Sequence, residues 1–250
     1  MAQLTTFRTA AARISKTANT SDWENDIQDA SAGNQITNLS ANSTGTAPGV
    51  GAQAGFYSGR GGATTGTIVR MFYEFSIPSE AVGNITGITL RIVPYSYGTG
   101  DVVVAKSTAS PSSNTYSLSD FSSYQSTAYS SVINPNGGSS PTWPTTTGTT
   151  QTFDITLNSN AISDANANNG LLRIVFMNYT YDFEVSEPSL GTNVYNGLRL
   201  ISGTNDDSGT RERLFVDYGY GNIVAGVAGA NIAKITDVAT ADIGKVTGVS

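Results

Sequence analysis

The stretch TIVRMFYEFSI at residues 67–77 alternates apolar and polar side chains with a period of two. One set of alternating positions is apolar: Val69, Met71, Tyr73, Phe75 and Ile77. The other set includes Arg70, Glu74 and Ser76. Because successive side chains of a β-strand point to opposite faces of a sheet, this alternation predicts a strand with one buried face. Any fold for the chain must therefore contain a sheet with an apolar side.

Other segments have the same strand-like character, at 87–95, 101–107, 151–157, 170–179, 197–202 and 211–218. Weaker candidates lie at 4–16, 34–39 and 52–57. The strong segments are bounded by Gly, Pro, Asn or Ser, which are typical of turns. Many strands without regular strand–helix alternation predict an all-β fold, and we expect an antiparallel β-sandwich of the jelly-roll type.

Helical structure is expected in only two places. Residues 158–170 offer Ser or Asn as an N-cap and Asn169-Gly170 as an end, which predicts one short helix. The Ser/Thr-rich segments 40–66 and 108–148 are expected to be long loops, with a short helical turn at 118–125. We expect a jelly-roll domain at residues 1–220 and an extended C-terminal tail at 221–250.

The tail contains one short phrase twice, because IAKITDV at 232–238 returns as IGKVTGV eleven residues later. Its Thr, Val and Gly content favours extended structure over a helix. So short a segment cannot bury its apolar side chains alone, and we expect it to dock on a sheet edge or to wind with copies of itself. The alternatives are that it folds back on its own domain or is disordered. The docking residues expected are Ile232, Ile235, Val238, Ile243, Val246 and Val249.

The chain has no histidine and no cysteine. This composition excludes Ser-His-Asp triads, Cys-His pairs, His-ligated zinc and iron–sulfur clusters. Glycoside hydrolysis would need two carboxylates, an acid and a nucleophile. The best local candidates are Glu184 and Glu187 with Asp182 nearby, but a charged loop after a strand is the favoured interpretation. Residues 164–170 begin like an EF-hand loop, but Val175 stands where the bidentate Glu belongs. We therefore expect no enzymatic activity, no metal and no cofactor.

The charge of the chain is acidic, with 13 basic and 19 acidic residues and a net charge of −6. Nucleic-acid binding needs clustered Lys and Arg, and the sequence has no basic run. No stretch approaches the roughly 18 apolar residues of a membrane span. Residues 1–16 lack the apolar core of a signal peptide, so we expect synthesis in the cytoplasm.

Tyrosines occur three times as a Tyr-x-Tyr pair near the end of an expected strand. On an extended segment, residues i and i+2 share a face, so each pair would form a flat aromatic step. Such rings suit the apolar faces of sugars, whereas the alternative role is to close the ends of the sandwich. The candidate glycan contacts are Tyr95, Tyr97, Tyr179, Tyr181, Tyr218 and Tyr220.

Arginines recur inside the strong strands, at Arg70, Arg91, Arg173, Arg199 and Arg213. We expect them on a solvated outer face, where Glu74 and Asp217 are suitable cross-strand partners. The rival interpretation is an electrostatic docking face, whose subunit contacts would be sensitive to salt.

The segment RMFYEFSIPSEAVGNITGITLRI, at 70–92, resembles the repeated pattern of DNRLRE-type and carbohydrate-binding-like jelly rolls. In that pattern an Arg-bearing strand leads into F-x-I-P, a turn and the next strand. The segments 118–125, 153–176 and 211–219 follow in the same order, so the resemblance covers about residues 67–220 and not the N-terminal third. The tail is similar to short I-x-K-V-x-G-V units near the ends of phage structural proteins.

Two functions follow from these expectations. The first is a non-enzymatic virion structural protein of a phage, such as a capsid-decoration, head-fibre or tail-associated protein. Its jelly roll would face outward, and its tail would anchor it to copies of itself or to other virion proteins. The alternative is a glycan-binding module of a surface or secreted protein, with cell-surface glycans as partners. The two are compatible, because many weak sites on one particle gain avidity.

Overall fold

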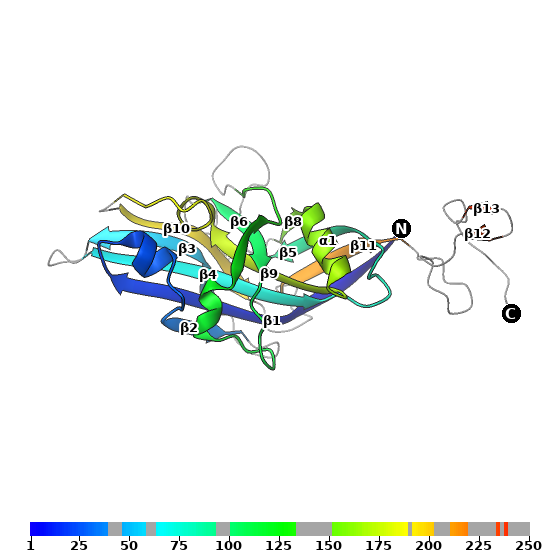
Figure 1. The fold of residues 1–250 in the computed structure, drawn as a ribbon, viewed down its shortest axis with the longest axis horizontal. Coiled ribbons are helices and arrows are strands. Elements are labelled where there is room, and N and C mark those ends of the chain that lie inside the picture. The colour runs from blue at the N-terminus through cyan, green and yellow to red at the C-terminus, as the bar shows by residue number, and fades with distance from the viewer. Residues whose placement is uncertain are drawn as a thin grey trace.

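The computed structural model describes residues 1–39, 47–58, 64–93, 101–133, 152–189, 192–202, 211–219, 234–235 and 238–239. The described strands form one 11-stranded antiparallel sheet and a separate two-stranded sheet (Figure 1). The all-β prediction is therefore confirmed. A two-sheet jelly roll is not confirmed, because the strands of the large sheet follow one continuous, curled path.

Thirteen strands and four helical segments make up the described structure. The strands are β1 (Ala2–Asn19), β2 (Gln35–Asn38), β3 (Ala47–Ser58), β4 (Thr64–Ser76), β5 (Ile85–Ile92), β6 (Val102–Ser107), β7 (Tyr124–Ala128), β8 (Phe153–Leu157), β9 (Leu171–Asn178), β10 (Thr192–Ser202), β11 (Arg213–Tyr218), β12 (Lys234–Ile235) and β13 (Val238–Ala239). The helical segments are η1 (Glu24–Gln28), η2 (Leu118–Ser122), α1 (Ser159–Ala167) and η3 (Tyr179–Phe183). Each segment predicted as a strand contains one, whereas β7, η1 and η3 were not predicted.

Strand β1 joins the two halves of the large sheet. Its residues 2–7 pair with β11, and its residues 8–19 pair with β4. The register shifts between Arg8 and Ala10, where the partner changes, and such bulges bend a strand and increase its twist. The path of the sheet runs β7-β6-β9-β4-β1-β11-β5-β8, with β2, β3 and β10 paired beside it.

The first hydrophobic core lies between the two halves of the curled sheet. Met71, Tyr73 and Phe75 of β4 share this core with apolar residues of β9. Opposite elements contribute residues of β5, β8 and β11, including Leu90 and Ile155. The buried face predicted for residues 67–77 is thus confirmed.

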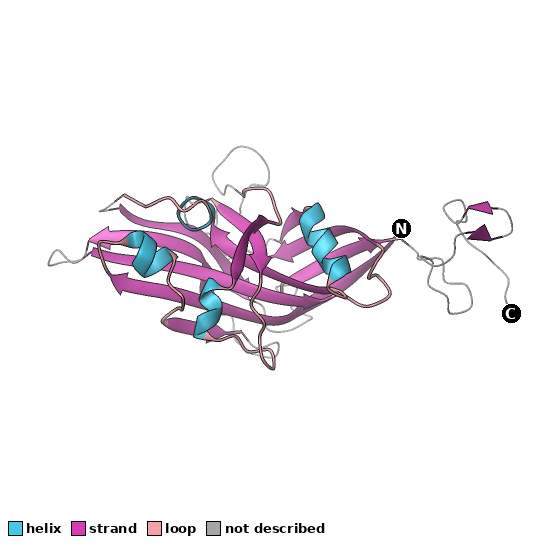
Figure 2. Cartoon of the chain, in the orientation of Figure 1, coloured by secondary structure: helices cyan, strands magenta, loops and turns pink. Residues whose placement is uncertain are grey.

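The opposite face of β4 is also buried, which corrects the expectation of a solvated outer face. Helical segments η1 and η2 lie in front of the strands in Figure 2. Trp23 and Ile27 at η1 and Phe121 of η2 join a second core with Phe72 of β4. Arg70 lies on this face and is fully buried.

Arg70 connects the covering segments to the sheet. Its guanidinium forms an ion pair with Asp182 of η3 at 2.6 Å. It also donates hydrogen bonds to the carbonyls of Phe121 (2.8 Å) and Gln28 (3.0 Å). The same group lies over the rings of Phe121 and Tyr124, at 4.1 and 4.3 Å from their centroids. One cation therefore contacts η1, η2, η3 and β7.

The remaining strand arginines have different environments. Glu74 pairs with Arg173 at 2.8 Å and not with Arg70. Arg91 pairs with Asp154 at 2.6 Å on a partly exposed surface. The guanidinium of Arg213 lies 5.8 Å from the centroid of the Phe7 ring. The side chain of Arg199 lies outside the described residues.

A second buried ion pair joins strand β1 to the residue that precedes strand β11. Arg8 of β1 contacts Glu212 at 2.7 Å, and both side chains are almost fully buried. The hydroxyl of Tyr73 donates a hydrogen bond to Glu212 at 3.2 Å, and Arg8 also donates to the carbonyl of Leu39 at 3.0 Å. This pair lies beside the point where β1 changes partner.

Helix α1 confirms the one predicted helix. The side chain of Asn158 caps it by accepting hydrogen bonds from Asn160 and Ala161. Gly170 follows the helix with φ +82°, and an added Cβ would lie 2.3 Å from the carbonyl oxygen of Ile77. A side chain at this position is therefore excluded by both conformation and space.

We predict that Asp182→Ala lowers the free energy of unfolding by about 3–5 kcal/mol, because it leaves the buried guanidinium of Arg70 uncompensated. Urea unfolding measures the change. Asp154→Ala is the matched control, since its pair with Arg91 is partly exposed and is worth at most about 1 kcal/mol. Equal losses in the two variants would contradict the anchoring role of Arg70.

Candidate functional site

A cavity of about 510 Å³ lies where β6 and β9 part. Pairing between these strands ends at Lys106 and Ile174. The cavity lies just beyond this last pair and is lined by the end of β6, the start of β9 and the C-terminal part of α1. Its polar lining includes Lys106, Thr108, Tyr129, Asp164, Asn169 and Arg173.

Asp164 is the central polar group of the cavity. Its Oδ2 accepts hydrogen bonds from the hydroxyl of Tyr129 and from the ammonium of Lys106, the latter at 2.9 Å. Its Oδ1 contacts no protein donor among the described residues. The Asp164 side chain is 25% exposed, so this second oxygen belongs to a group that solvent and ligands reach.

The protonation states in the cavity follow from these contacts. Burial raises the pKa of Tyr129, and the hydrogen bond to Asp164 raises it further, so the phenol remains a donor. Burial alone would raise the pKa of Asp164, but the hydrogen bonds from Tyr129 and Lys106 outweigh burial and lower the pKa below its usual value. At neutral pH Asp164 is therefore a carboxylate and Tyr129 a neutral phenol.

Local structure holds Tyr129 and Asp164 together. The backbone N–H of Asn158 donates to the carbonyl of Tyr129 at 2.8 Å, and its side-chain amide donates to Ala128 at 2.8 Å. Ala161 and Ala165 of α1 are fully buried. The helix that carries Asp164 is thus fixed both to the chain beside Tyr129 and to the first core.

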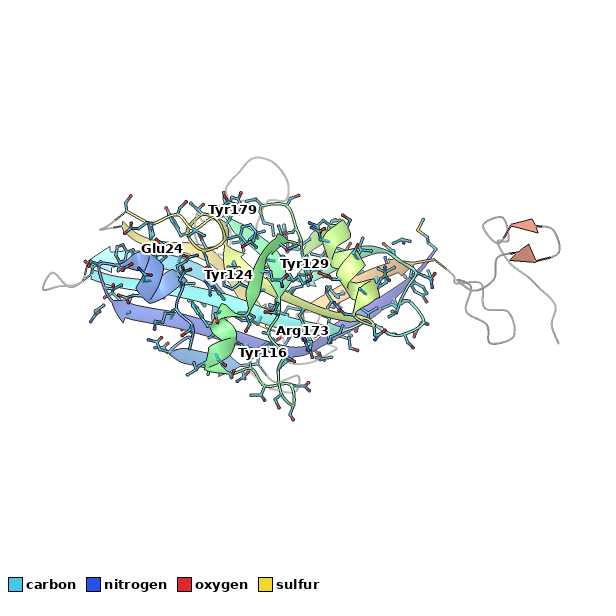
Figure 3. The ribbon with its side chains drawn as sticks, viewed as in Figure 1. Glu24, Tyr116, Tyr124, Tyr129, Arg173 and Tyr179 are labelled. Atoms are coloured by element: carbon cyan, nitrogen blue, oxygen red, sulfur yellow. The ribbon has the colours of Figure 1, made fainter. Side chains whose placement is uncertain are left out.

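The opposite wall of the cavity is also fixed. Arg173 pairs with Glu74 at 2.8 Å and donates to the hydroxyl of Ser110 at 3.1 Å. Tyr129 and Arg173 are labelled in Figure 3 beside α1. Thr108 and Asn169 are exposed lining residues. The cavity therefore combines ordered charged groups with accessible hydroxyl and amide groups.

The predicted aromatic step at Tyr179 and Tyr181 is not formed. Both residues lie in η3, a helical turn, and not on an extended segment. The ring of Tyr179 stacks on the ring of Phe183, with the centroids 6.0 Å apart. The hydroxyl of Tyr179 donates a hydrogen bond to Glu184. The premise that the two rings share one flat face is wrong, because a helical turn points residues i and i+2 in different directions.

Of the other predicted tyrosines, the structure describes only Tyr218. Tyr218 ends β11 opposite Ala2 and is half-buried against the first core. Tyr95, Tyr97 and Tyr220 lie outside the described residues.

The predicted docking residues of the tail are described at only two positions. Ile235 of β12 and Val238 of β13 are antiparallel partners in the small two-stranded sheet. The other four, Ile232, Ile243, Val246 and Val249, lie outside the described residues. Docking on another chain remains a prediction.

The carboxylates considered for hydrolysis are separated by environment. Asp182 is buried against Arg70, whereas Glu184 and Glu187 are exposed. In the part of the chain that the structure describes, acidic side chains form no group of three or more that could hold a metal. Over the same residues, helices of the length and apolar character needed to cross a membrane are absent.

Sequence reasoning missed the cavity. In the sequence, Asp164 resembles the start of a calcium loop, and no motif marks Lys106 or Tyr129. The one available signal was Lys106 itself, a charge near the end of the otherwise apolar run VVVA. Nothing in the sequence connects it with a helix almost sixty residues later; the separation is 58 positions.

Comparison with known proteins adds no assignment. The sequence matches no family model, and a search of curated proteins finds no match.

We predict that Lys106→Met raises the pKa of Asp164, because burial is then opposed only by the hydrogen bond from Tyr129. In the native chain, ionised Asp164 contributes stability above its unfolded pKa of about 3.9, and this is lost as the pH falls through the lower folded value. A carbon-detected NMR titration of the carboxyl group measures both proteins. Lys16→Met is the control and should leave the pKa of Asp164 unchanged. If the pKa of Asp164 is also unchanged in Lys106→Met, the pairing of Lys106 with Asp164 is contradicted.

Proposed function

We propose that the chain is a non-enzymatic structural protein of a phage virion, such as a capsid-decoration, head-fibre or tail-associated protein. The observation that carries this proposal is the repeated tail. Its two copies of one apolar phrase follow the sheet domain, and Ile235 and Val238 pair in a small sheet of their own. A repeated apolar phrase of this kind suits docking on another chain or on copies of itself.

The position of the tail supports an anchoring role. Strand β11 ends at Tyr218, which is paired with Ala2, so the tail follows the end of the sheet at which the N-terminus lies (Figure 1). An anchor at this end would leave the opposite end of the elongated sheet domain directed away from the particle. Its partners would be copies of itself or other virion proteins, and its location would be the virion.

The sheet domain suits exposure on a particle. Strand β4 is buried on both faces. Two buried ion pairs, Arg8–Glu212 and Arg70–Asp182, stabilise the segments packed around it. We further propose that the two halves of the curled sheet correspond to the layers of a jelly roll, since β4 and β9 share one core with β5 and β8. The glycan-module alternative has less support, because Tyr179 and Tyr181 form no aromatic step.

We predict that the full chain is a defined oligomer in solution and that a chain stopped after Gly221 is a folded monomer. Light scattering coupled to size exclusion measures the two masses, and circular dichroism verifies that the shortened chain keeps its strands. The physical reason is that removing the tail removes the apolar positions proposed to dock.

A double substitution tests the same contact in a chain of full length. Ile235→Asp with Val238→Asp places charges at the paired positions without shortening the chain, and it should also give a monomer. If all three proteins have the mass expected for their own monomers, self-association through the tail is overturned.

A further inference from the structure

The cavity between β6, β9 and α1 has the size and chemistry of a small-ligand site. Its volume of about 510 Å³ falls within the range of roughly 300–1,000 Å³ that is usual for ligand pockets. A few fixed polar groups in such a pocket set ligand orientation and specificity. The virion role proposed above does not account for this cavity.

An unused acceptor and unused donors lie next to each other in the cavity. Asp164 Oδ2 is occupied by Tyr129 and Lys106, whereas Oδ1 has no protein donor among the described residues. The ammonium of Lys106 carries three N–H donors, and its contact with Asp164 at 2.9 Å uses one. A ligand with adjacent hydroxyl groups can donate to Oδ1 with one and accept from Lys106 with the other.

The charges of the cavity select against an ionic ligand. Lys106 is balanced by Asp164, and Arg173 is balanced by Glu74. An anion would have to compete with two carboxylates, and a cation with an ammonium and a guanidinium. A neutral ligand with many hydroxyl groups meets neither penalty.

The remaining lining fits the same class of ligand. Thr108 and Asn169 supply further accessible hydrogen-bonding groups, and Ala167 and Leu171 supply a small apolar surface for C–H groups. Asp164 is already held in place by Tyr129, so binding would not have to order it first.

We propose that this cavity binds one neutral sugar residue, with adjacent hydroxyls of the ring contacting Asp164 Oδ1 and Lys106 Nζ. The site differs from the tyrosine pairs and stands independently of the proposed virion role. It would give the sheet domain a carbohydrate contact on the side that carries α1.

The direct test is an NMR titration of the full ¹⁵N-labelled chain with D-glucose, D-galactose and D-mannose at millimolar concentrations. The expected result is a saturable shift for at least one sugar, confined to the amides of Thr108, Asn168, Asn169 and their neighbours. No saturable shift with any of the three sugars, or shifts elsewhere only, overturns the proposal.

Two variants assign the contact. Asp164→Asn should weaken binding at least about tenfold, because an amide replaces the charged acceptor. Asp154→Asn makes the same chemical change in the exposed pair with Arg91 and should bind as the native chain does. Equal affinity in Asp164→Asn and the native chain would remove Asp164 from the site.

A third variant keeps the test decisive should Asp164→Asn fail to fold. Ala167→Phe adds bulk at an exposed helix position that lines the cavity, without removing a polar contact, and should abolish the shifts.

D-glucuronate is the ionic comparison. Tight binding of D-glucuronate without binding of the neutral sugars contradicts the selection for neutral ligands. None of these variants should alter the solution mass, so failure here is distinct from failure of the tail proposal.

Discussion

The buried guanidinium of Arg70 is the constraint on which the arrangement of the second core depends. An isolated charge in a protein interior carries a large desolvation cost, which only an opposite charge and well-placed acceptors offset. Asp182, two backbone carbonyls and two aromatic rings meet this requirement together. These partners come from segments far apart in the sequence. The covering layer and the sheet therefore stabilise each other, and neither arrangement is favourable alone.

The sequence predicted the strands well and their surroundings poorly. Alternation is a local property, so β4 and β9 could be located without knowing what covers them. The burial of Arg70 could not be inferred, because a charged residue at alternate positions normally marks a solvated face, and its partner Asp182 lies 112 positions away. Segments η1 and η3 have five residues each, too few for a helical period to be visible.

The candidate site illustrates the same limit. The N-cap at Asn158 and the glycine at the end of α1 located the helix correctly, because caps are local signals. The cavity depends on where two strands separate and on which side of α1 faces them. Lys106, Tyr129 and Asp164 come from three separate segments, and only the folded chain brings them into contact. For the pair Tyr179 and Tyr181, the local pattern was misleading, because these residues continue from a strand into a helical turn.

Strand β1 has a consequence for how the chain folds. Its residues 2–7 pair with β11, and Arg8 contacts Glu212, which lies 204 positions later in the chain. Contacts between such distant residues require a large loop to close first, which slows folding. During synthesis, residues 2–7 are made long before β11, the strand with which they pair. Until β11 is made, residues 2–7 lack this partner, and the newly made chain is open there to chaperones and to aggregation.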